Sequence, residues 1–231
     1  MFTKKVIIVA GAAGNVGSSL ARLLASRGAR VAAVDTLKSP LEAVVGSLGG
    51  SGHMALSDYD MTDFASSGAL VAKVQTTCGR VDGVGTTIGG FTMARLLDAG
   101  VEQWNAMFNL NVTTTWNLYR AAVPALRQAG GGALVAVGSA AGLRGGAEMA
   151  AYSGAKSAVL RLTESLADEL RSDRIRVNAV LPTTIDTAQN RQAMPEADTS
   201  RWVKPSEVAE AMAFLLSDAA SGVTGALLPI G

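Results

Sequence analysis

The chain has few of the residues from which metal and nucleic-acid sites are built. Only one of its 231 residues is cysteine, which excludes an internal disulfide, and only one is histidine. Neither Cys78 nor His53 has ligand partners at metal spacing. We expect no metal site, with Cys78 as a small packing residue and His53 facing solvent. Only 17% of residues are charged, the net charge is +1, and no basic cluster exists, so nucleic acid is not an expected partner.

Long apolar runs are also missing, although 48% of the residues are hydrophobic. No run approaches the roughly 20 residues that cross a bilayer, so we expect no contact with a membrane. The apolar run after Lys4 and Lys5 is short and breaks into glycines, unlike a signal peptide. Without a targeting signal, we expect a cytoplasmic location. The composition supports one large core but not two comfortable domains, so residues 1–231 are expected to form one domain.

What the chain does have is an alternation of short apolar runs with longer helical patterns. This alternation predicts an α/β fold of the doubly wound (Rossmann) type, a parallel seven-stranded sheet with helices on both faces. Strands are predicted over residues 5–10, 29–35, 53–58, 82–87, 132–138, 175–181 and 225–230, and the longest helices over 102–128 and 149–172. The segment 183–204 has no clear pattern, and we interpret it as a lid or binding loop, with a plain surface connection as the alternative.

A glycine-rich turn follows the first predicted strand. The run G11-A-A-G-N-V-G17 lies between that strand and a segment of helical periodicity. Glycine permits a tight turn and close approach of a pyrophosphate, and the following helix offers free N–H groups. The order of strand, turn and helix therefore predicts a dinucleotide site, and a turn that binds nothing is the alternative. Its residues are Gly11, Gly14, Asn15, Val16 and Gly17.

An acidic residue, Asp35, ends the second predicted strand, about 20 positions beyond the glycine turn. A carboxylate there accepts hydrogen bonds from the ribose hydroxyls of adenosine and repels a 2′-phosphate. Asp35 therefore favours NAD over NADP and NADH over NADPH, although Lys38 lies close to it in the sequence.

A Tyr152-x-x-x-Lys156 motif stands thirteen residues after Ser139. Positions i and i+4 of a helix share a face, so the phenol and the ammonium can point into one pocket. We expect the ammonium to lower the pKa of Tyr152, which would then exchange a proton with an alcohol or carbonyl oxygen. Ser139 would donate a second hydrogen bond to that oxygen. A chance pair on a solvated helix is the alternative.

These motifs together resemble the short-chain dehydrogenase/reductase family over essentially the whole chain. The resemblance implies one domain that binds a nicotinamide nucleotide and acts on a small-molecule substrate, as a homodimer or homotetramer. The family's catalytic set is matched by Asn111, Ser139, Tyr152 and Lys156. Asn111 is preferred over Asn109 because it follows Trp104 by seven residues.

The same resemblance assigns the remaining cofactor contacts. It places an acidic residue and its neighbour, after the third strand, beside adenine. It adds a glycine after the fourth strand to the cofactor contacts, and it places a segment after the sixth strand on the nicotinamide amide. It also gives the tyrosine and lysine a share in holding the nicotinamide ribose. The matching residues are Asp60, Met61, Gly89, Pro182, Ile185, Thr187, Tyr152 and Lys156.

The chain departs from the family pattern in its binding loops. Ala10 and Asn15 replace a threonine and a glycine of T-G-x-x-x-G-x-G, and Gly14 is expected to take over the close approach to the cofactor. The family's N-N-A-G is replaced by T86-T-I-G89, and its Pro-Gly by Pro182-Thr183. With I88-G-G-F91, these departures resemble the dihydropteridine reductase branch.

Three functions follow from these residues. The first is an NAD(P)-dependent oxidoreductase that transfers hydride between nicotinamide and a carbonyl or alcohol, with Tyr152 as general acid and base. The second is a pterin reductase; the resemblance argues against it at Ser139, because dihydropteridine reductases have alanine there. The third is a non-catalytic NAD-binding sensor, which has no need of a proton donor such as Tyr152.

Overall fold

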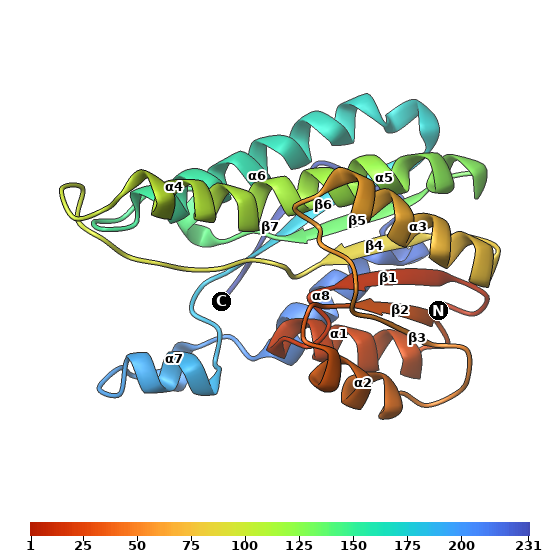
Figure 1. Cartoon of the computed structure of the whole chain (residues 1–231), viewed down its shortest axis with the longest axis horizontal. Helices are drawn as coiled ribbons and strands as arrows, with labels where there is room; N and C mark the ends of the chain where they lie inside the picture. Colours follow the sequence, from red (N-terminus) through yellow and green to blue (C-terminus); the bar gives the residue numbers. More distant parts are fainter.

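Seven parallel strands form one sheet in the order β3-β2-β1-β4-β5-β6-β7 in the computed structural model, which describes residues 1–231 (Figure 1). The strands are β1 Val6–Ala10, β2 Arg30–Val34, β3 Met54–Leu56, β4 Gly83–Thr86, β5 Gly132–Val137, β6 Ile175–Pro182 and β7 Leu227–Ile230. All seven predicted strands are confirmed, with ends that move by one or two residues. All five residues of β1 are buried, as a central strand covered on both faces requires.

The strand order reverses beside β1, because the chain runs outward to β2 and β3 and then returns to β4 on the other side. The loops that follow β1 and β4 therefore leave the sheet in opposite directions. A crevice forms at such a point in doubly wound folds, and ligands bind there beyond the carboxyl ends of the strands.

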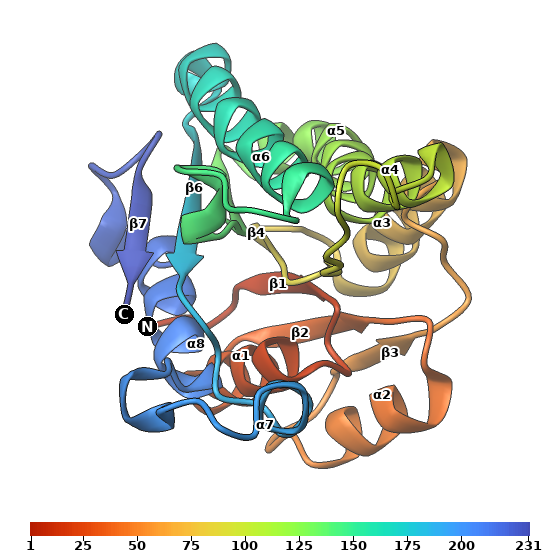
Figure 2. The same ribbon diagram turned by 90° about the vertical axis from the view of Figure 1, so that its left-hand side faces the viewer.

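Helices cover both faces of the sheet, as predicted. The helices are α1 Asn15–Ser26, α2 Lys38–Gly46, α3 Phe64–Cys78, α4 Val101–Phe108, α5 Thr114–Gln128, α6 Ala150–Glu169, α7 Ala188–Ala193 and α8 Pro205–Leu216. Buried residues of α1, α2 and α8 form one hydrophobic core with one face of the sheet. Buried residues of α3, α5 and α6 form a second core with the opposite face (Figure 2). None of these helices combines the length and apolar character needed to cross a membrane.

The helix predicted over 102–128 is interrupted in the structure. A π-helical turn, Asn109–Thr113, separates α4 from α5. The Asn111 side-chain amide donates to the Met107 carbonyl at 2.9 Å, the group that the Asn111 N–H bonds in an α-helix. Side-chain competition for that carbonyl accounts for the local change, and turns of this kind are frequent at functional sites. The other long helix ends at Glu169, before a 3-10 turn over Arg171–Asp173.

The segment 183–204 contains the short helix α7 and returns to its own start. Ile185 and Val203 form an isolated parallel bridge, which closes the segment at its base. Within it, Arg191 forms a two-pronged ion pair with Asp186, with N–O distances of 2.6 and 2.8 Å. The segment projects from the carboxyl ends of the strands (Figure 1).

His53 does not face solvent as expected. Its ring is half-buried, Nδ1 accepts from the Val31 N–H at 3.1 Å, and Nε2 lies 2.9 Å from the Gly49 carbonyl oxygen. The expectation was wrong because a glycine-rich loop folds back far enough for the imidazole to satisfy backbone groups on β2. Cys78 is half-buried against the Met54 sulfur, consistent with a packing role.

Candidate active site

The glycine turn after β1 is closely packed at two of its glycines. Gly11 has φ +80°, a conformation that favours glycine. A Cβ on Gly17 would lie 2.0 Å from the Gly11 carbonyl oxygen, so no larger residue fits there. Gly14 precedes α1 and is exposed; a Cβ there would meet only that same oxygen, at 3.3 Å. No side chain caps α1, and the turn therefore fits a pyrophosphate brought against its backbone.

Thr87 holds this turn against β4, a role that is not evident from its place in the sequence. Its hydroxyl lies 3.0 Å from the Ala10 carbonyl oxygen and 3.1 Å from that of Gly11. A Cβ on Gly11 would come within 2.6 Å of the same hydroxyl. The departure from N-N-A-G was the available signal, because it places another short polar side chain where the family has asparagine.

The Asp35 carboxylate directly follows β2 and lies beside the glycine turn. Its Oδ2 accepts from the Ala13 N–H of the turn at 3.0 Å, and its Oδ1 accepts from the Leu37 N–H at 3.1 Å. Each carboxylate oxygen has a further lone pair available for a ribose hydroxyl. Asp35 therefore links the turn to the end of β2 and keeps the capacity to bind a ligand.

The Asp60 carboxylate is partly committed to its own loop. Its Oδ1 accepts from the Thr62 N–H at 2.8 Å and from the Thr62 hydroxyl at 2.7 Å, and these hydrogen bonds lower the pKa of Asp60. Met61 is buried, and Asn117 donates to its carbonyl oxygen at 3.1 Å. Loop 60–62 is thus fixed from α5, and the amide of Asn117 is a positioning group that the sequence analysis did not identify.

Asn111, Gly89 and Lys156 converge at the carboxyl end of β4. The Asn111 amide pairs with both backbone groups of Gly90, accepting at 3.3 Å and donating at 3.2 Å. A Cβ on Gly89 would lie 2.8 Å from Asn111 Oδ1 and 3.2 Å from Lys156 Nζ. Only glycine leaves this space open, so the three residues form a polar cradle that a ribose or amide group would fill.

Lys156 is almost entirely buried and has one hydrogen-bond partner. The residue is 5% exposed, and its ammonium donates to the carbonyl of Val137, the last residue of β5, at 2.9 Å. Burial disfavours the charged form and lowers the pKa of Lys156 to about 8. Protonation of this side chain therefore changes just above neutral pH.

Tyr152 and Ser139 lie together beside that lysine. Lys156 Nζ is 5.9 Å from the centre of the Tyr152 ring. Ser139 Oγ accepts from the Ala141 N–H at 3.1 Å, which leaves its O–H free to donate. The predicted lowering of the Tyr152 pKa was wrong for the net effect: burial raises the pKa of Tyr152, and the Ser139 hydroxyl only partly opposes this. Burial prevails because the lysine is itself buried and its charge is disfavoured.

The predicted nicotinamide segment begins where expected. Pro182 is the last residue of β6 and is buried, and Ile185 forms the base of the 183–204 segment. The Thr187 hydroxyl caps α7 by accepting from the Asn190 N–H at 3.1 Å, and the Ile185 carbonyl accepts from the Asn190 amide at 2.8 Å. Thr187 keeps its O–H as a donor, so the cap does not prevent it from binding an amide carbonyl.

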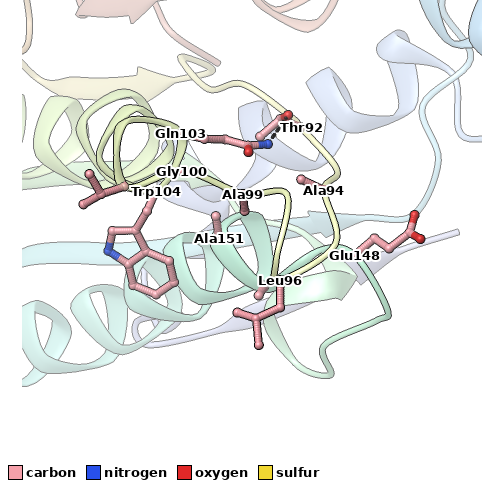
Figure 3. A pocket seen from close by; sticks show the side chains of 11 residues that line it. Thr92, Ala94, Leu96, Ala99, Gly100, Gln103, Trp104, Glu148 and Ala151 are labelled. Carbon is pink, nitrogen blue, oxygen red and sulfur yellow. Dashed lines mark hydrogen bonds between the residues drawn. The ribbon is translucent and has the colours of Figure 1, made fainter.

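A cavity of about 230 Å³ lies next to these residues but does not contain them. It is bounded by the loop before α4 and by the first turns of α4 and α6 (Figure 3). Trp104 and Leu96 line it, and so do Ala150 and Ala151, which directly precede Tyr152. The cavity adjoins the catalytic candidates, which themselves lie at the carboxyl ends of the strands and on the helices beside them.

The arrangement agrees with a comparison against protein families. The family model described as Enoyl-(Acyl carrier protein) reductase matches residues 11–230. The chain belongs to the short-chain dehydrogenase/reductase family. The resemblance from sequence motifs is thereby confirmed over nearly the whole chain.

Relatives and solved structures of this family match the chain from end to end. The cis-4-hydroxycyclohexanecarboxylate dehydrogenase of Sinomonas cyclohexanicum is 37% identical over 239 residues, covering 99% of this chain and 96% of that protein. The D-threitol dehydrogenase of Mycolicibacterium smegmatis is 32% identical, covering 98% and 91%. An NAD⁺-bound xylitol dehydrogenase structure is 28% identical with a TM-score of 0.91, covering 99% and 98%. The short-chain dehydrogenase/reductase described here is accordingly an NAD(P)-dependent oxidoreductase, which argues against a non-catalytic sensor.

Proposed function

We propose that this reductase transfers hydride between NAD(H) and a carbonyl or secondary alcohol, with Tyr152 as the general acid and base. The observation that carries the proposal is the Ser139 hydroxyl beside the Tyr152 phenol, because two donors at one point suit a reacting oxygen. The relatives described above are named for hydroxyl-bearing compounds, which supports the same chemistry. Residues 1–231 act together as one NAD-binding reductase domain.

The glycine turn, Asp35, loop 60–62, Gly89 and segment 182–187 are the places that would hold the dinucleotide. The nicotinamide, when bound, supplies or accepts the hydride at the substrate carbon. In the reducing direction Tyr152 gives its proton to the carbonyl oxygen while Ser139 donates a hydrogen bond to it. Lys156 then replaces the proton on Tyr152, because its own pKa of about 8 makes release possible near neutral pH. Asn111 Oδ1 lies close to the same space as Lys156 and orients the water that returns a proton to the lysine.

Ser139→Ala separates this proposal from a pterin reductase. Removing one of two donors to a reacting oxygen is expected to lower kcat for a ketone about a hundredfold. Binding of NADH, followed by its fluorescence, is expected to stay unchanged, because the Ser139 hydroxyl interacts with the Ala141 N–H and with Tyr152 and not with the glycine turn or Asp35. Steady-state NADH oxidation with small ketones and with quinonoid dihydropterin provides the measurement.

Ser153→Ala is the matched control for that substitution. Ser153 adjoins Tyr152, is 7% exposed, and has a hydroxyl without a hydrogen-bond partner. Its loss is expected to leave kcat unchanged. A Ser139→Ala enzyme with full ketone activity contradicts the two-donor mechanism, and rapid turnover of the pterin by that variant favours the pterin reductase.

We propose NAD rather than NADP as the preferred cofactor, and Asp35→Asn tests it. The amide keeps an acceptor for the Ala13 or Leu37 N–H but removes the charge that repels a 2′-phosphate. The ratio of kcat/KM with NADPH to that with NADH is expected to rise roughly tenfold, a change of 1.4 kcal/mol. Asp168→Asn, at an exposed position of α6, should leave the ratio unchanged. A wild-type enzyme that prefers NADPH would refute the proposal directly.

We propose a homodimer or homotetramer as the assembly. Large apolar side chains stand exposed along α4, the π-helical turn and α5: Trp104 is 45% exposed, Leu110 37% and Trp116 42%. Exposed aromatic and aliphatic groups that gather on one side of a protein are typical of association surfaces. Light scattering of the purified protein measures the assembly. The cytoplasmic location stays a prediction from the sequence.

A further inference from the structure

Phe91 covers the catalytic tyrosine with part of its ring and leaves the rest uncovered. The Phe91 and Tyr152 rings meet edge to face, with centroids 4.8 Å apart and planes at 85°. Phe91 is nevertheless 58% exposed, and no role was assigned to it above. A large apolar surface beside the proton donor is the first surface that a substrate body meets when its oxygen reaches Tyr152.

The backbone on both sides of Phe91 is fixed to other elements. On one side, Gly90 is paired with the Asn111 amide through both its N–H and its carbonyl. On the other side, the Ala94 N–H donates to the Glu148 carbonyl at 2.8 Å. Glu148 itself has φ +63°, a conformation that non-glycine residues rarely adopt. Residues 90–94 therefore form a strap, tied at both ends, that holds the Phe91 ring against Tyr152.

Polar side chains of the strap region have partners within the chain. The Glu148 carboxylate pairs with Arg95 at 3.3 Å, and the Thr92 hydroxyl accepts from the Gln103 amide at 2.7 Å (Figure 3). A polar substrate body placed on the Phe91 ring would lose water without gaining a hydrogen bond from the ring. An apolar substrate gains binding energy when it covers the Phe91 ring and removes apolar surface from water. A cyclic substrate also loses little conformational freedom when it binds there.

We propose that Phe91 is a substrate-contacting residue that determines specificity, and that it selects carbonyl compounds whose carbonyl carbon belongs to an apolar ring. This inference rests on the carbonyl chemistry of the proposed function. The free part of the Phe91 ring packs on the hydrocarbon ring of the substrate, while Tyr152 and Ser139 bind its oxygen. The same contact is made by the product, a cyclic secondary alcohol.

Phe91→Ala tests the contact between the Phe91 ring and the substrate with two ketones, the apolar cyclic cyclohexanone and the small polar hydroxyacetone. For cyclohexanone, kcat/KM is expected to fall roughly tenfold, mainly through KM, because an aromatic packing surface is lost. For hydroxyacetone it is expected to change less than about twofold, since that substrate gains little from the ring. NADH affinity, measured by fluorescence, should be unchanged. Phe91→Trp, which restores an aromatic wall, is expected to recover most of the cyclohexanone activity.

Leu96→Ala provides the matched control on the same loop. Leu96 is 83% exposed and lines the neighbouring cavity, which Tyr152 does not line, so neither ketone should respond to its truncation. Equal losses on both ketones in Phe91→Ala, or a loss in Leu96→Ala as large as that in Phe91→Ala, overturn the inference and leave the proposed function standing. A wild-type preference for hydroxyacetone also overturns the inference alone. A wild-type enzyme that reduces no ketone refutes the proposed function and the inference with it.

Discussion

Tyr152→Phe is expected to lower kcat for ketone reduction by about a thousandfold or more. The substitution removes only the hydroxyl, the group that the proposed mechanism uses to give a proton to a substrate oxygen beside Ser139. Phenylalanine keeps the edge-to-face contact with Phe91, so the surrounding loops should hold their positions. NADH affinity by fluorescence titration is expected to change little, and single-turnover reduction of a ketone measures the loss in the chemical step.

Tyr119→Phe is the control for that experiment because the chain offers a second tyrosine of opposite character. Tyr119 is 1% exposed in α5, and its hydroxyl has no hydrogen-bond partner. Burial raises the pKa of Tyr119, so the group stays a neutral phenol. Its removal should leave kcat unchanged and should not lower the free energy of unfolding, since an unsatisfied buried polar group is itself unfavourable. Appreciable activity in Tyr152→Phe would end the assignment of Tyr152 as proton donor.

The strands and their common edge were predictable because their signals are local. A run such as Val6–Ala10 is apolar throughout, and a parallel sheet covered on both faces requires that composition. Once the strands are placed, the topology brings the residues after them to one edge, so Gly11, Asp35 and Ser139 could be grouped without any coordinates. The glycines of the turn also predicted its place, because a position such as Gly17 has no room for a side chain.

The features that escaped prediction depend on side-chain contacts and burial, within one turn of a helix or between distant segments, that hydrophobic periodicity does not reveal. The π-helical turn arises from the balance between the Asn111 side chain and the backbone at Met107, which no periodicity reveals. The hydroxyl of Thr87 is important because β4 lies beside β1, a relation that the sequence does not state locally. The sign of the Tyr152 pKa shift was wrong for a related reason: the i+4 lysine was visible in the sequence, but the burial of both side chains was not.

Gly17→Ala is expected to weaken NADH binding roughly hundredfold, which corresponds to about 2.7 kcal/mol. The new methyl group would stand 2.0 Å from the Gly11 carbonyl oxygen and 2.8 Å from the Thr87 hydroxyl. The first of these neighbours is backbone, so the turn must move away from α1, and the N–H groups that would meet the pyrophosphate move with it. Overpacking of this kind also costs about 1–3 kcal/mol of stability, so thermal unfolding should begin several degrees lower.

Gly46→Ala separates the loss of the binding turn from a general effect of replacing glycine. Gly46 ends α2, and a Cβ there would meet nothing within 4 Å. Alanine in a helix is favoured over glycine by roughly 0.5–1 kcal/mol, so this variant should unfold at a slightly higher temperature and bind NADH as the wild type does. If Gly17→Ala instead kept full NADH affinity while its unfolding temperature fell, the turn would be a structural element only, and the dinucleotide would have to lie elsewhere along the strand ends.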